Sequence, residues 1–131
     1  MDALVDVAEF VPSNDIDGDC GTTLAFRFDT EEKARAFAKV PGVRGTLPID
    51  TGRHVYTNWD PIMKKRGACH PAMDPFKMEA NRDIVPDYRA DMCPATLDLL
   101  ARSVYVGINP DLSEEKMEEK LASLRAALQN L

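Results

Sequence analysis

The stretch TTLAFRF, residues 22–28, predicts a β-strand, and the fold class depends on what surrounds it. A second stretch, SVYVGI at residues 103–108, has the same pattern. In both, every second side chain is large and apolar: Leu24, Phe26 and Phe28 in the first, and Val104, Val106 and Ile108 in the second. Such alternation is typical of a strand that buries one face.

Two further strands are predicted, one over residues 5–11 at an edge of the sheet and one over residues 44–49. Pro48 limits the second strand, because it has no amide hydrogen to donate to a ladder.

The clearest helix is predicted after Ser113, whose hydroxyl can accept a free amide of the first turn. Glu114 and Glu115 follow, where the helix dipole favours negative charge. Apolar side chains recur on one face of this helix at Met117, Leu121, Leu124 and Leu128. A stripe of this kind must pack on the rest of the domain.

Three shorter helices are predicted from their start signals. One follows Asp29, which resembles a capping box together with Glu32, and ends at Pro41-Gly42. Another begins at Asp60-Pro61, with the aspartate as N-cap and the proline in the first turn. The third begins at Pro94.

The predicted order is strand, strand, helix, strand, long loop, helix, strand, helix. This order has too few alternations for a doubly wound parallel sheet. We therefore expect an α+β fold, with a short, largely antiparallel sheet and helices packed on one face. The length of 131 residues suits a single domain over residues 1–131. The long excursion at residues 67–86 has little periodicity, and loops of that length are often functional or mobile.

Composition excludes several classes of protein. The formal net charge is −6, whereas nucleic-acid binders are usually basic, so no nucleic-acid partner is expected. The basic run Lys64-Lys65-Arg66 is interpreted as a solvated helix end. No apolar run approaches the roughly 20 residues of a membrane-spanning helix, and the acidic start does not resemble a signal peptide. We expect a cytoplasmic protein without membrane association, and its three widely spaced cysteines argue against a disulfide framework.

No metal site or catalytic residue is predicted from the short motifs. The acidic run at residues 15–19 resembles a calcium loop, but neither of its two frames has an acidic ligand at position twelve. A turn is the better interpretation. Cys69, His70 and Cys93 lack the paired spacing of zinc ligands. A nucleophilic pair of Cys69 with His70 would lack an orienting third group.

The segment GRHVYTNWD, residues 52–60, combines polar groups with aromatic rings and includes the single tryptophan. Such a mixture suits a surface that binds a polar ligand such as a sugar or a phosphate. The alternative is structural: Tyr56 and Trp59 would anchor the loop on the core, and His54 would satisfy a buried amide.

Three ordered stretches resemble one family. They are DCGTTL at residues 19–24, HVYTNW at residues 54–59 and DMCPATLDLLAR at residues 91–102. Together with the Asp-Leu-Ser cap and the last helix, they resemble the C-terminal small domain of the DegT/DnrJ/EryC1/StrS aminotransferases. These enzymes act mainly on sugars and nucleotide sugars.

The resemblance implies a small domain of the aspartate-aminotransferase kind, a pyridoxal phosphate (PLP) cofactor and a homodimer in the full enzyme. In this family the lysine that binds PLP lies in a large domain, which has no counterpart in these 131 residues. A lysine with that role needs a desolvated site that lowers its pKa. We therefore expect no PLP binding and no transamination by this chain alone, and the missing large domain becomes its expected partner.

The resemblance assigns a substrate-binding role at the mouth of the active site to His54, Tyr56, Asn58 and Trp59. The excursion at residues 67–86 is either a lid over that mouth or a packing loop. A free-standing sugar-binding, nucleotide-binding or interaction module with the same fold is the alternative function. A stand-alone enzyme using Cys69 or His70 is a third.

Overall fold

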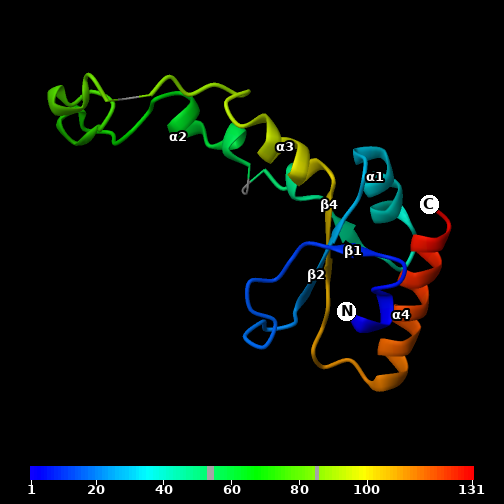
Figure 1. Cartoon of the computed structure of the whole chain (residues 1–131). Helices are drawn as coiled ribbons and strands as arrows, with labels where there is room; N and C mark the ends of the chain where they lie inside the picture. Colours follow the sequence, from blue (N-terminus) through cyan, green and yellow to red (C-terminus); the bar gives the residue numbers. More distant parts are fainter. Residues whose placement is uncertain (53–54, 85) are drawn as a thin grey trace.

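The computed structural model describes residues 1–52, 55–84 and 86–131. Its centre is a four-stranded antiparallel sheet with the order β1-β2-β4-β3. The strands are β1 Glu9–Phe10, β2 Thr23–Arg27, β3 Gly45–Thr46 and β4 Ser103–Gly107. The predicted α+β class, with its short antiparallel sheet, is confirmed (Figure 1).

In the described residues, four α-helices accompany the sheet in the order predicted from the sequence. They are α1 Glu31–Lys39, α2 Asp60–Met63, α3 Pro94–Ala101 and α4 Glu114–Gln129. Single turns of 3-10 helix lie at η1 Asp2–Leu4, η2 Pro48–Asp50, η3 Tyr56–Asn58, η4 Pro71–Met73 and η5 Glu79–Asn81. In the described parts of the chain, no helix has the length and apolar character needed to span a membrane.

The core lies between one face of the sheet and the helices α1 and α4 (Figure 1). Phe26 of β2 is its centre, with ring centroids 5.0 Å from those of Phe10 and Phe37. Val104 and Val106 of β4 are fully buried beside it. On the opposite face, Tyr105 remains 41% exposed. Helices therefore cover one face only, because the strands alternate apolar and polar positions.

The two edge strands, β1 and β3, are shorter than predicted. Of residues 5–11, Glu9 and Phe10 form β1 and pair with β2, and the Val11 amide donates to the Ala25 carbonyl at 2.8 Å. Of residues 44–49, only Gly45 and Thr46 pair with β4, because Pro48 cannot donate and instead begins η2. Gly45 permits a close approach here, since a Cβ at this position would lie 2.5 Å from Cγ1 of Val104 and 3.0 Å from Cα of Ala38.

Two predicted helix caps are wrong by one residue, and one is confirmed. The cap of α1 is Thr30, whose hydroxyl accepts from the Lys33 amide at 3.3 Å, while Asp29 forms an ion pair with the Lys33 ammonium. Asp60 is the first residue of α2 rather than its cap. Its carboxylate accepts a hydrogen bond from Nζ of Lys64 at 2.7 Å. Ser113 caps α4 as predicted.

The core position of Val104 predicts a matched pair of substitutions. Val104→Ala removes two buried methyl groups and leaves a cavity, so we expect the free energy of unfolding to fall by about 2–3 kcal/mol. Val5→Ala makes the same chemical change at a side chain that is 69% exposed. It should change the free energy of unfolding by less than about 0.5 kcal/mol. Chemical denaturation followed by circular dichroism measures both. Equal losses would contradict this account of the core.

Candidate functional site

Residues 55–84 and 86–93, here called the arm, leave the sheet after η2 and return to it through α3 (Figure 1). Only two of these residues are buried, Val55 and Asp74. Several large apolar side chains of the arm are exposed: Trp59, Met73, Met78, Ile84 and Met92. The arm therefore has almost no core of its own and holds its shape through a few polar contacts.

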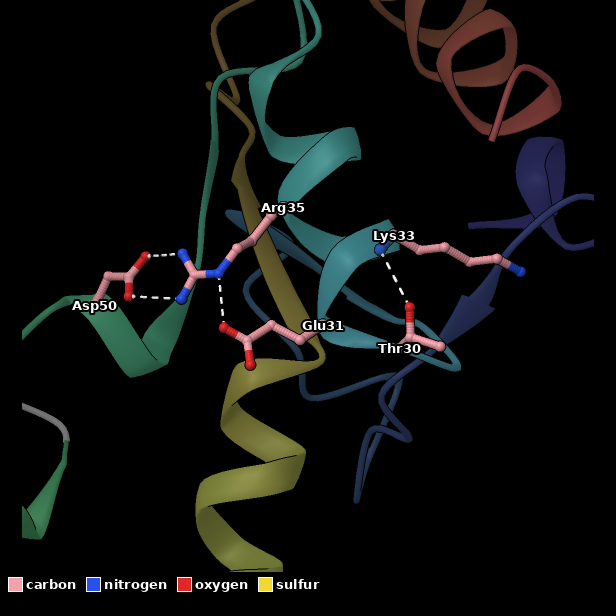
Figure 2. Close-up of polar contacts among 5 residues, drawn as sticks. All are labelled: Thr30, Glu31, Lys33, Arg35 and Asp50. Carbon is pink, nitrogen blue, oxygen red and sulfur yellow. Dashed lines mark hydrogen bonds and ion pairs between the residues drawn. The ribbon is translucent and has the colours of Figure 1, made fainter.

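An arginine fork fixes the chain just before the arm begins. Nη1 and Nη2 of Arg35 donate to the two carboxylate oxygens of Asp50 at 2.8 and 3.2 Å, and Nε donates to Glu31 at 2.7 Å (Figure 2). Hydrogen bonds from Arg35 lower the pKa of the Asp50 carboxyl. Because a bidentate pair fixes both distance and orientation, α1 holds η2 and hence the root of the arm.

Tyr56 ties the outgoing and returning chains of the arm together. Its hydroxyl donates to the carbonyl of Ala90 at 2.6 Å and accepts from the amide of Cys93 at 3.2 Å. Val55 beside it is 1% exposed and anchors the same turn in the protein. One side chain thus closes the base of the arm immediately before α3.

Asp74 organises the distal part of the arm. Its Oδ1 accepts from the Phe76 amide at 3.0 Å, and its Oδ2 lies 3.1 Å from Nζ of Lys77. Burial raises the pKa of this carboxyl, but bonds from Lys77 and from the amides of Phe76 and Gly67 outweigh burial, so the pKa lies below its ordinary value. A buried carboxylate of this kind is stable only while these donors surround it.

The four predicted substrate-binding residues differ in their burial and in their contacts. His54 lies outside the described residues. Tyr56 is half-buried, and its hydroxyl bonds to the returning chain of the arm. Asn58 is exposed at the end of η3, and Trp59 is 47% exposed where α2 begins. The arm base therefore presents an amide and an indole on a segment fixed by Tyr56.

The acidic run at residues 15–19 forms turns, as predicted. Oδ1 of Asp15 accepts from the amides of Asp17 and Gly18 at 3.2 Å, and Oδ1 of Asp19 accepts from Gly21 at 2.9 Å. Within residues 1–52, 55–84 and 86–131, no group of three His, Cys, Asp or Glu side chains could hold a metal ion.

The three cysteines are exposed, and His70 bonds to a neighbouring amide. Cys20, Cys69 and Cys93 are free and exposed thiols. Nδ1 of His70 accepts from the Ala72 amide at 3.2 Å and caps η4. His70, next to Cys69, therefore stabilises the start of η4.

The lysines of this chain do not fit PLP. None of the seven is buried: Lys33, Lys39, Lys64, Lys65, Lys77 and Lys116 are exposed, and Lys120 is half-buried. A lysine that holds PLP needs a desolvated setting that lowers its pKa, and none of these positions supplies one.

Comparison with known proteins adds no assignment, since no protein-family model and no curated protein matches this chain.

The contacts that shape the arm had only partial signals in the sequence. The turn Asp74-Pro75-Phe76 is a recognisable pattern for an aspartate that bonds to the amide two residues on. The burial of Asp74 has no such signal. The Arg35–Asp50 fork and the Tyr56 contacts join positions 15, 34 and 37 residues apart, which local patterns do not specify.

Tyr56→Phe tests the closure of the arm base. The substitution keeps the ring but removes the hydroxyl shared by Ala90 and Cys93, so we expect the Cys93 amide to exchange with solvent about five- to tenfold faster, a loss of roughly 1 kcal/mol. Hydrogen exchange resolved by residue measures this. Tyr105→Phe, in β4, is the control and should leave Cys93 unchanged. Unchanged exchange in Tyr56→Phe would contradict the closure.

The lowered pKa of Asp74 predicts an acid-sensitive arm. A carboxyl whose folded pKa is depressed stabilises the fold above its unfolded pKa and loses that effect as the pH falls through the folded pKa. Protection of the Phe76 amide should therefore persist above pH 3.8, the ordinary carboxyl pKa, and fall below it.

In Asp74→Asn, this protection should be low at neutral pH and lose its acid transition. Hydrogen-exchange protection factors of the Phe76 amide, measured between pH 2 and 7 in both proteins, test this prediction. An acid transition that persists in Asp74→Asn would assign it to another group.

Proposed function

We propose that this chain is the C-terminal domain, or a fragment containing that domain, of a PLP-dependent aminotransferase that acts on the keto group of a sugar or nucleotide sugar. The observation that carries the proposal is the arm, which presents Asn58 and Trp59 on a fixed base yet buries only Val55 and Asp74. A segment with exposed apolar side chains and so little core is suited to completing a surface with another polypeptide.

In this proposal the chain binds and orients substrate. Trp59 offers an indole face on which a sugar ring can pack, and Asn58 offers an amide donor and acceptor for hydroxyl groups. His54 is assigned to the same surface by the family resemblance, and Tyr56 maintains its geometry through Ala90 and Cys93. PLP, held by the partner large domain, supplies the electron sink for amino transfer. The full enzyme is proposed to be a homodimer.

A second function is a free-standing module that binds a sugar or nucleotide, or another protein. It is favoured by a different observation, the buried core around Phe26, Phe37 and Leu124. In addition, Arg125 fastens the N-terminal turn to α4 through Asp6, with two bonds of 2.8 Å, and through the Ala3 carbonyl. Such a core can support a binding surface without a second domain.

The two functions differ in a direct test. The codons in frame upstream of Met1 should encode a PLP domain with its lysine, and the longer product should develop the absorbance of lysine-bound PLP. The 131-residue chain should not develop it. Specific absorbance from this chain alone, or the lack of a PLP domain in frame, would favour the free-standing module.

In the longer enzyme, Asn58→Ala should raise KM for the nucleotide sugar about tenfold and change kcat little, because it removes a contact made equally in the ground and transition states. Steady-state kinetics measure both constants. Arg82→Ala is the matched control, since Arg82 is exposed on the arm and pairs with Glu79. Equal KM values for the two variants would exclude Asn58 from the substrate site.

A further inference from the structure

An apolar recess lies at the end of the sheet where β2 begins and β4 ends. It has a volume of about 340 Å³, within the roughly 300–1,000 Å³ of small-molecule sites. Its floor includes Leu24 and Ile108 from the sheet side and Met117 and Leu121 from α4. All four of these side chains are only half-buried.

The recess lies where the first turns of α4 are only partly covered by the rest of the protein. The apolar stripe of this helix buries Leu124 and Ala127, whereas Leu121 and Met117, one and two turns before Leu124, remain half-buried. Two exposed apolar side chains also line it: Met1, 45% exposed, and Ile16, 64% exposed. Figure 1 shows the N-terminal turn beside α4 in this region.

The charges that line the recess restrict its occupant. Lys120 is the one lysine or arginine among its lining residues, and among the described residues it forms no ion pair; its ammonium donates to the Val43 carbonyl at 3.5 Å. Asp19 also lines the recess, and its Oδ1 already accepts from Gly21 in a turn. A ligand with an apolar body and one anionic end would bury its body on Leu24, Met117 and Leu121 and place its anion at Lys120.

We infer that this recess binds a small amphipathic carboxylate, of the medium-chain fatty-acid type. The inference is independent of the proposed aminotransferase role, because none of the residues that line the recess belongs to the arm. Apolar burial supplies most of the affinity, and the Lys120 ammonium selects the carboxylate.

The six methionines allow a direct test with the probe decanoate. Met1 and Met117 line the recess, whereas Met63, Met73, Met78 and Met92 lie on the arm. With methyl-labelled methionine, titration of the full chain with decanoate should shift the Met117 signal saturably and leave the arm signals in place. Shifts confined to the arm, or no saturable shift of Met117, would overturn the inference.

The charge is tested separately with decanol, which has the same chain without the anion. Decanoate should bind about tenfold more tightly than decanol. Lys120→Glu should abolish that preference and leave decanol binding unchanged, and Lys116→Glu, on the same helix but outside the recess, should preserve it.

Equal affinities of the unmodified chain for decanoate and decanol would overturn the role of Lys120 without relying on any variant. A Met117 signal that depends on protein concentration before ligand is added would show that a second copy fills the recess, which would also overturn the proposal. Neither result bears on the PLP test of the aminotransferase role, so the two proposals fail separately.

Discussion

The pairing of β2 with β4 is the interaction on which the rest of the structure depends. Five residue pairs join these strands, from Thr23 opposite Gly107 to Arg27 opposite Ser103, whereas each edge strand contributes only two residues. The pairing places Phe26 beside Val104, where α1 and α4 can cover both. It also joins segments far apart in the chain, so the loop-closure entropy must be offset by burial across this one ladder.

The arm is tolerated because its two ends are fixed to this scaffold. Asp50 is held by Arg35 where the chain leaves, and α3 is held where the chain returns, because Nη1 of Arg102 donates to the Phe28 carbonyl at 2.9 Å while Nε and Nη2 bond to Asp98. Since the entropic cost of a loop grows slowly with its length once the ends are fixed, the fold can carry a long excursion. A fixed base with a thinly packed extension is the usual arrangement for a binding segment on a rigid scaffold.

The elements that can be predicted from the sequence are those whose pattern is complete within one segment. The alternation in β2 and β4 and the apolar stripe after Ser113 specify those elements, and their order specifies the α+β class. The cap of α1 is Thr30, one residue after the predicted cap, because the neighbouring Asp29 is an equally good cap residue. The edge strands are short because pairing partners, which no local pattern contains, decide where they end. For the candidate site, the sequence predicts His54, Tyr56, Asn58 and Trp59 as a group, but the contacts of Tyr56 with Ala90 and Cys93 arise only from the returning chain.

The two candidate sites lie toward opposite ends of the same strands. The arm joins the sheet through α3 at the Ser103 end of β4, and the recess lies at the Gly107 end, beside Ile108. The central ladder between them is continuous and tightly packed, with Phe26, Val104 and Val106 fully buried. Packed interiors resist gradual deformation. A ligand in the recess and a partner on the arm should therefore bind with independent free energies, which makes the sheet a rigid spacer between two separate surfaces.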